Sequence, residues 1–200
     1  MLDGQNTQLP APRVSVVTDP DLGGKKPYLM ERSWYRFFAN LYNYFVNLPY
    51  GSFYNTGVHS ATANTPTAVT YDSSANTRHT SIGTPTSRIV FDADGLTTIT
   101  FSLQLSNSSA TADDVYVWLR KNGVDVPYTA SAITVPGKHG SVNGAAILTV
   151  NFHETYGPGD YLELYWLTVN GTTTLATIPA SVSPAIPASP SVVLTVSQII

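Results

Sequence analysis

The side chains best suited to metal binding or acid–base chemistry are four histidines in separate segments, His59, His79, His139 and His153. Protein metal sites combine His, Cys, Asp or Glu side chains that regular spacing brings to one place. The adjacent pair His153-Glu154 would point to opposite faces of a regular strand. None of the four histidines has a His, Cys, Asp or Glu side chain two to four residues later, so the sequence predicts no metal site.

Three carboxylates, Glu154, Asp160 and Glu163, lie close together in the sequence. Glycoside hydrolysis uses two carboxyl groups flanking the scissile bond, and the acid has a raised pKa. Nothing in the sequence indicates that two of the three converge in this way. No G-x-S-x-G, Walker, zinc or dinucleotide motif occurs, and the chain has no cysteine. We therefore expect no catalytic residue, no cofactor and no enzymatic activity, with a small glycosidase as an alternative.

The glycine-rich stretch Gly137–Gly144, GKHGSVNG, is a candidate binding loop. A phosphate cradle needs a helix after the loop, whose amides point at the anion. Here a predicted strand follows, so the stretch is interpreted as a loop at one end of a β-sandwich. Loops on a rigid scaffold are common recognition sites. Its side chains Lys138, His139 and Asn143 are therefore candidate outward contacts.

The composition narrows the classes of partner. Charged residues make up 12% of the chain and the net charge is −3, which argues against a broad cationic surface for nucleic acid or anionic lipid. No apolar run approaches the ~20 residues needed to span a bilayer. The first residues lack the basic and apolar regions of a secretory signal. We expect no nucleic-acid partner and no membrane insertion.

The elements expected after residue 50 are strands, organised around Asp114–Pro127, DVYVWLRKNGVDVP. Asn122-Gly123 predicts a two-residue type I′ turn, because both residues tolerate positive φ. Asp tolerates the same turn, so Asn122→Asp is expected to be nearly neutral. Ahead of the turn, Val115, Val117 and Leu119 alternate with Tyr116 and Trp118, and either set can face the core.

Short strands at ~8–12-residue spacing predict an all-β sandwich or barrel over residues 50–200. Its predicted strands are Gly51–Ser60, Thr67–Tyr71, Arg88–Asp92, Thr97–Leu105, Asp114–Lys121, Val124–Val126, Ala132–Val135, Ala145–Glu154, Tyr161–Asn170, Thr173–Ile178 and Ser191–Ser197. Four prolines in Pro179–Pro190 predict a polyproline II crossing ahead of the last strand.

Residues 1–49 are predicted to form a separate anchor, with a helix over Glu31–Leu48. Met1–Pro27 has no core of its own and is either a mobile tail or an extended strap that lies on a partner protein. The helix has an aromatic stripe at spacings of three and four, and Pro49 ends it. Seven of its 18 residues are aromatic, more apolar area than a helix packed on its own domain needs. The stripe meets either its own domain or another chain. The predicted oligomer or virion interface is Trp34, Phe37, Phe38, Leu41, Tyr44, Phe45 and Leu48.

Several motifs resemble known families. Asn122-Gly123-Val124 after an aromatic strand, the step GDYLEL at Gly159–Leu164 and the closing Ser191–Val196 resemble the C1q/TNF-type jelly roll. The same module, with LPAPRV and WYRFFANLYNYF before it, also resembles structural proteins of tailed-bacteriophage virions. The resemblance implies an antiparallel jelly-roll sandwich that forms a homotrimer.

The resemblance also implies a location and partners. It predicts a bacteriophage virion structural protein, a tail-fibre or tail-associated appendage that faces the host. The alternatives are a head decoration or cement protein at three-fold positions of the capsid, and a carbohydrate-binding module. The implied partners are further copies of the chain, the tail or major capsid protein, and a glycan or receptor of the host surface.

Overall fold

The computed structural model describes residues 15–17, 28–29, 32–46 and 48–199 and divides the chain into two units, Met1–Asn47 and Leu48–Ile200. In the first unit, β1 (Ser15–Val17) pairs antiparallel with β2 (Tyr28–Leu29), and α1 spans Arg32–Val46. The helix prediction is therefore correct to within two residues at each end. The rest of the predicted strap lies outside the described residues.

Helix α1 exposes part of its aromatic stripe. Trp34, Phe37, Phe38 and Leu41 are between 39% and 56% exposed. The rings of Trp34, Phe37 and Phe38 pack on one another with centroids 5.4–6.0 Å apart. Leu48 is half-buried at the start of the second unit. The side chains of Tyr44 and Phe45 lie outside the described residues, so their predicted interface role stays a prediction.

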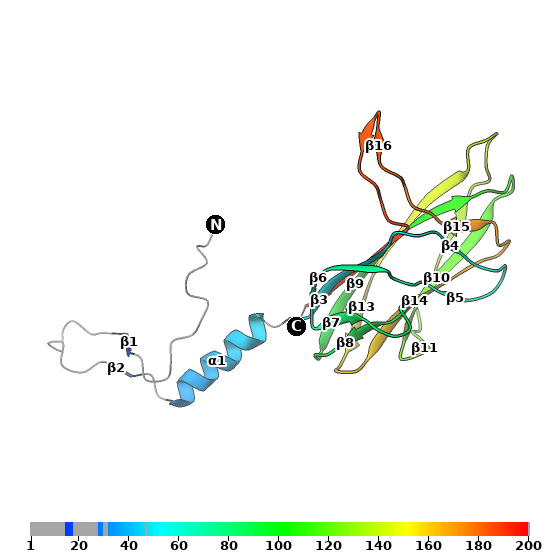
Figure 1. Ribbon diagram of the computed structural model, residues 1–200. Helices are drawn as coiled ribbons and strands as arrows, with labels where there is room; N and C mark the ends of the chain where they lie inside the picture. The colour runs from blue at the N-terminus through cyan, green and yellow to red at the C-terminus, as the bar shows by residue number, and fades with distance from the viewer. Residues whose placement is uncertain (1–14, 18–27, 30–31, 47, 200) are drawn as a thin grey trace. The chain divides into compact units, whose positions relative to one another are not determined.

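The second unit is built from two antiparallel sheets (Figure 1). The sheet around β9, called the β9 sheet, contains β4 (His59–Ser60), β15 (Thr173–Leu175), β9 (Gly95–Asn107), β18 (Val192–Gln198), β3 (Tyr50–Asn55), β6 (Ser73–Arg78) and β13 (Gly144–Tyr156). The sheet around β14, called the β14 sheet, contains β11 (Val124–Asp125), β10 (Asp113–Lys121), β14 (Tyr161–Thr168), β8 (Ile89–Phe91), β7 (Thr80–Ile82), β12 (Ser131–Val135) and β5 (Thr67–Ala68).

One core fills the space between the two sheets. Most of its side chains come from alternate positions of the strands, as the two-residue period of a strand requires. Those at most 1% exposed include Phe53, Ile99, Phe101, Leu103, Val115, Val117, Leu119, Leu164, Trp166 and Leu194. The all-β prediction is confirmed. On β10 the core face is Val115, Val117 and Leu119, which leaves Tyr116 exposed and Trp118 half-buried on the outer face.

The hairpin between β10 and β11 has the predicted turn. Asn122 and Gly123 have φ of 52° and 79°, and Lys121 pairs with Val124. The side chain of Asn122 also donates to Asp160 Oδ1 at 2.7 Å and accepts from Tyr161 N at 2.9 Å. Asn122→Asp is therefore expected to be destabilising and not neutral, because an aspartate here would face the Asp160 carboxylate.

The stretch Pro179–Pro190 is not a polyproline II crossing. It forms a hairpin, β16 (Ser181–Val182) with β17 (Ala185–Ile186), closed at its base by a bridge between Ile178 and Ser189. Its four prolines fall outside the two short strands, where no ladder N–H is needed. Figure 1 shows this hairpin projecting from the sandwich.

The hairpin interrupts one long strand. β15 (Thr173–Leu175) pairs with residues 105–107 of β9, and β18 pairs with residues 97–103, while β13 pairs with the other side of β9 over its whole length. Gln104 lies between the two pairings and bonds to both sides, since Ala176 N donates to Gln104 O and Gln104 N donates to Ser191 O. The chain therefore leaves the β9 sheet after Ala176, forms the hairpin and re-enters the sheet at Ser191, with both residues opposite Gln104.

Candidate interaction surface

Asp113, at the start of β10, is the most connected buried carboxylate. It accepts hydrogen bonds from the Thr168 hydroxyl, from the Asn170 amide at 2.9 Å and from the Thr172 and Thr173 amides at 3.3 and 3.0 Å. Burial favours the neutral acid, but these donors outweigh it and lower the pKa of Asp113 to about 2. The carboxylate ties the β14 sheet to the start of β15 in the β9 sheet, which is a structural role.

The three carboxylates considered for catalysis are each held by other groups. Lys121 Nζ lies 3.8 Å from Glu154 and 3.5 Å from Asp160. The Asn122 amide, the Gly157 N–H and Lys121 lower the pKa of Asp160. Glu163 is 5% exposed and accepts from the Ser87 hydroxyl at 2.8 Å, with Arg88 Nε at 3.7 Å. A general acid needs a raised pKa, and this arrangement lowers that of Asp160.

The histidines lie apart. His79 contacts Asp92 at 2.7 Å, and His153 contacts the Thr98 hydroxyl at 3.2 Å. Burial lowers the pKa of His59, and His139 is exposed in the loop before β13. Within the part of the chain that the structure describes, no three His, Cys, Asp or Glu side chains lie close enough to hold a metal ion.

The outer face of the β14 sheet carries charges that pair within the chain. Asp125 accepts from Trp118 Nε1 at 2.7 Å and pairs with Arg120. These bonds lower the pKa of Asp125 and raise that of Arg120. The Arg120 guanidinium stacks 3.9 Å from the centre of the Tyr165 ring, and the Arg88 guanidinium stacks on another tyrosine of β14. Each cation on this face therefore has a partner.

The outer face of the β9 sheet is uncharged over most of its area. Strands β3, β9, β15 and β18 contain no Asp, Glu, Lys or Arg. Hydroxyl and amide side chains pair across strands, as Thr149 does with Ser102 at 3.2 Å and Asn151 with Thr100 at 2.6 Å. Such pairs satisfy one another, and the face keeps little unpaired polar capacity.

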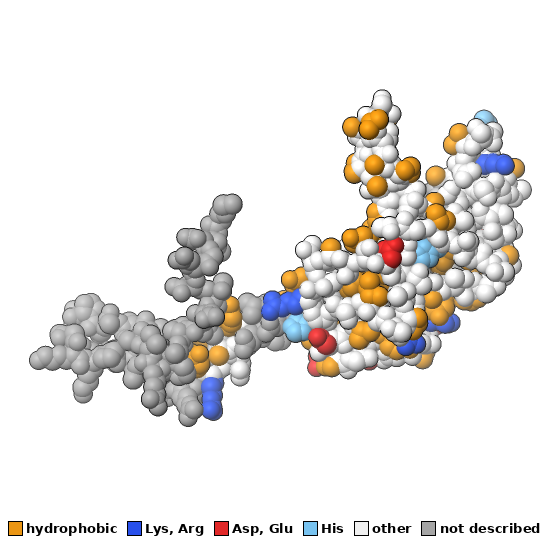
Figure 2. All heavy atoms as spheres, in the orientation of Figure 1, with side chains coloured by type: hydrophobic (Ala, Val, Ile, Leu, Met, Phe, Trp, Pro, Cys, Tyr) orange, Lys and Arg blue, Asp and Glu red, His pale blue; other side chains and the backbone are white. Residues whose placement is uncertain are grey.

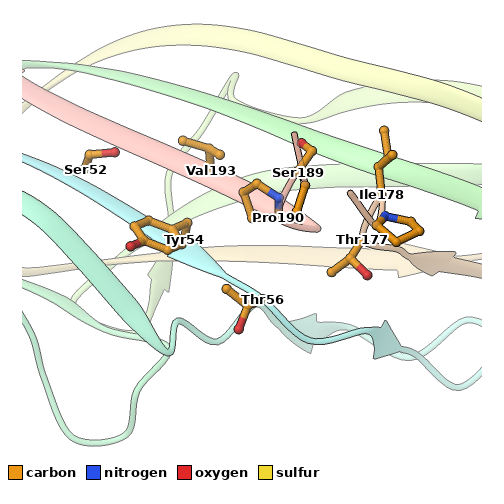
Figure 3. A pocket seen from close by; sticks show the side chains of 10 residues that line it. Ser52, Tyr54, Thr56, Thr177, Ile178, Ser189, Pro190 and Val193 are labelled. Carbon is orange, nitrogen blue, oxygen red and sulfur yellow. The ribbon is translucent and has the colours of Figure 1, made fainter. Parts of the chain in front are cut away.

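Two grooves open on this face, one on each side of the hairpin base. The Tyr54 groove, of about 480 Å³, lies between β3, β18 and the hairpin; Figure 3 shows its lining side chains, among them Tyr54, Val193, Pro190 and Ile178. The Ile147 groove, of about 730 Å³, lies between β9, β13 and the hairpin and includes Val142, Asn143, Ile147 and Ile178. Neither groove is lined by a charged side chain.

Hydrophobic side chains gather on the projecting hairpin, where Figure 2 shows no charged side chain. Val182 is 95% exposed, and Ile186 and Ile178 are exposed by more than two fifths. An apolar projection beside two uncharged grooves is the surface of the described sandwich best suited to binding another molecule.

The predicted loop residues stand in two different places. Lys138 and His139 are exposed in the loop between β12 and β13, and neither lines the Tyr54 groove or the Ile147 groove. Asn143 lines the Ile147 groove and donates to the Ser106 hydroxyl at 3.2 Å. Sequence reasoning missed Tyr54, Ile147 and the hairpin. One feature of the sequence did indicate an uncharged surface in this part of the chain, because no charged side chain or histidine follows Glu163.

No family model matches the sequence, and no curated protein matches it. The fold is similar to that of a TNF protein, Eiger of S. frugiperda, with a TM-score of 0.50 and 9% identity over 77% of this chain and 94% of that one. The globular domain of zebrafish complement 1qA matches with a TM-score of 0.43 and 10% identity over 76% and 98%. The sandwich of residues 48–199, with its two antiparallel sheets, therefore has a C1q/TNF-like jelly-roll fold.

No helix of the described residues is long and apolar enough to cross a membrane.

Proposed function

We propose that the protein is a bacteriophage virion structural protein, a homotrimeric appendage attached through residues 1–49 and facing the host through its jelly roll. The proposal rests on a structural difference between the two units. The sandwich closes its own core, whereas helix α1 leaves an aromatic stripe exposed. The resemblance of both parts to tailed-bacteriophage structural proteins supplies the class.

The trimer is supported by the chemistry of the β9 sheet. Each copy has a net charge of −3, so charged surfaces of two copies repel when they meet. The outer face of the β9 sheet avoids this repulsion, because four of its strands contain no charged side chain. Interface centres are depleted of charge in the same way. The C1q/TNF resemblance implies three copies.

The test has two measurements. Light scattering of the purified protein should give about three times the chain mass of 21.5 kDa, and a monomer at micromolar concentration would contradict the trimer. Deletion of residues 1–48 should leave a folded β domain by circular dichroism that no longer joins virions. Unfolding of the truncated protein would show that the helix belongs to the core and that the anchor model is wrong.

The tail-fibre or tail-associated position is preferred, and the head decoration position is the second candidate. The exposed helix fits both, since either attaches the sandwich to a particle through its first unit. Counting copies per virion against the major capsid protein separates them. A count comparable with that protein indicates decoration, and a small fraction of it indicates a tail part. Binding of a soluble oligosaccharide by the isolated sandwich would instead favour a carbohydrate-binding module.

A further inference from the structure

The hairpin β16–β17 carries apolar side chains into solvent at a place where the sheet does not need them. Val182 is 95% exposed, and Ile186 and Ile178 are 43% and 41% exposed. The pairing of β15 and β18 with β9 continues on both sides of Gln104, so the hairpin adds no pair to the β9 sheet. Apolar residues that gather on a projection in this way mark a contact with another molecule.

The Ile147 groove is the concave surface beside it. Its volume is about 730 Å³, within the range of clefts that enclose drug-sized ligands and therefore several side chains. Val142 and Ile147 on its walls are 70% and 60% exposed. Groove and hairpin thus expose the same kind of surface, one concave and one convex.

The charge pattern favours a second copy of the chain as the occupant. No charged side chain follows Glu163, and none lines the groove. Two copies with a net charge of −3 each can bring these surfaces together without placing like charges side by side. A glycan needs oriented polar groups, and Val182 and Ile186 offer none from their side chains.

We infer that the hairpin tip Ser181–Ile186 of one copy docks in the Ile147 groove of the next copy, which completes the contact between neighbours in the proposed trimer. The inference rests on the trimer of the proposed function. Hairpin and groove are different surfaces, so the contact is head-to-tail and closes when the rotation between copies returns the third to the first. Ile178, at the hairpin base, then lies beside the neighbour's arriving tip.

Disulfide trapping tests the contact, because the wild-type chain contains no cysteine. Val182→Cys and Ile147→Cys are made as separate single variants, with tags of different length, and are co-expressed and mildly oxidised. A non-reducing gel should show a mixed dimer containing one chain of each kind. Separate variants exclude a bond within one chain.

The matched control replaces Ile147→Cys by Val124→Cys. Val124 is 70% exposed and lies on β11 of the other sheet, so it should not trap Val182→Cys. The inference is overturned if the mixed dimer is no more abundant with Ile147→Cys than with Val124→Cys.

A substitution at the tip gives a second readout. Val182→Asp should weaken self-association at least tenfold, by light scattering over a dilution series, while the circular dichroism spectrum keeps the β signature of the folded sandwich. Val124→Asp should leave self-association unchanged. Equal behaviour of the two variants would also overturn the inference.

The outcomes separate this contact from the proposed function. A wild-type trimer without specific trapping overturns the contact and leaves the trimer in place. A monomeric wild-type protein overturns both. Specific trapping in a protein that is absent from purified virions supports the contact and overturns the virion role.

Discussion

The outer faces of the two sheets are stabilised by different chemistry. On the β14 sheet, Arg120 pairs with Asp125 and stacks on Tyr165, so the charges of one chain satisfy one another. On the β9 sheet, hydroxyl pairs such as Thr149 and Ser102 leave a neutral face with two grooves and an apolar hairpin. Charges that pair within one chain need no partner protein in water. Exposed apolar side chains, in contrast, are stabilised when a partner covers them.

Asp113 connects the two sheets, and its loss should have the largest effect. Asp113→Ala removes the acceptor for the Thr168 hydroxyl and for the amides of Asn170 and Thr173. Because a buried donor left without an acceptor costs about 1–3 kcal/mol, the free energy of unfolding should fall by about 3–5 kcal/mol. Urea unfolding measures this. Asp113→Asn keeps one acceptor oxygen and should lose less; equal losses would show that the hydrogen bonds are not the cause.

The two faces of β10 can be compared within one strand. Leu119 is fully buried, so Leu119→Ala should destabilise the protein by about 2–5 kcal/mol. Trp118 is half-buried on the outer face and donates to Asp125, so Trp118→Ala should cost about 1 kcal/mol, the value of a net hydrogen bond. Thermal unfolding of both variants shows which substitution destabilises the protein more. If Trp118→Ala is the more damaging, the assignment of the core face is wrong.

A charge placed on each outer face tests the comparison directly. Thr149 and Tyr116 are both exposed, on the β9 and β14 sheets respectively. Thr149→Glu should weaken trimer formation by about a hundredfold or more, because like charges meeting in an interface cost several kcal/mol. Tyr116→Glu should leave it unchanged. Sedimentation equilibrium measures both, and a reversed order would place the contact on the β14 sheet.

Acid should weaken the connection between the sheets. The pKa of Asp113 falls from 3.8 to about 2 on folding, so its contribution is fully present above pH 4 and is lost as the pH falls through 2. A shift of this size corresponds to about 2 kcal/mol. Urea midpoints between pH 5 and pH 2 should decline less in Asp113→Asn than in wild type. Parallel declines would assign the acid sensitivity to other carboxylates.

A small effect is expected at the rim of the β14 sheet. Asn122→Asp keeps the turn, but it places a second carboxylate where Asn122 Nδ2 now donates to Asp160 at 2.7 Å. The loss should be about 1 kcal/mol, the value of one hydrogen bond. The double variant Asn122→Asp with Asp160→Asn should recover part of it. No recovery would mean that the repulsion is not between these two groups.

Local patterns in the sequence predicted the parts of the fold that depend on local chemistry. The turn at Asn122-Gly123 requires only that these two residues adopt positive φ. The alternation of side chains in 97–105 matches the alternating burial along β9. β6 was missed because SSANTR has no apolar alternation, and backbone pairing with β3 holds it in the sheet. Which face of β10 is buried depends on the facing sheet, since both faces of that strand are apolar.

The interaction surface was less predictable, for a physical reason. Its grooves join β3 to the hairpin base and β13 to β9, segments far apart in the chain. The hairpin was hidden by Pro179, Pro184, Pro187 and Pro190, since prolines argue against strands. They are compatible with it here because the paired residues, such as Val182 and Ala185, fall between them. Side-chain type indicated the neutral character of the surface, but not its shape.

The way the long strand is interrupted has a consequence for how this domain can vary. Ala176 and Ser191 both bond to Gln104, so the sheet register is the same whatever the length of chain between them. Loop-closure entropy rises only slowly with length, by about 0.6 kcal/mol per doubling. Residues 177–190 can therefore vary in length without shifting the register of the β9 sheet. A longer or shorter arm there would change the inferred contact with the next copy, while every strand of the β9 sheet would keep its partner.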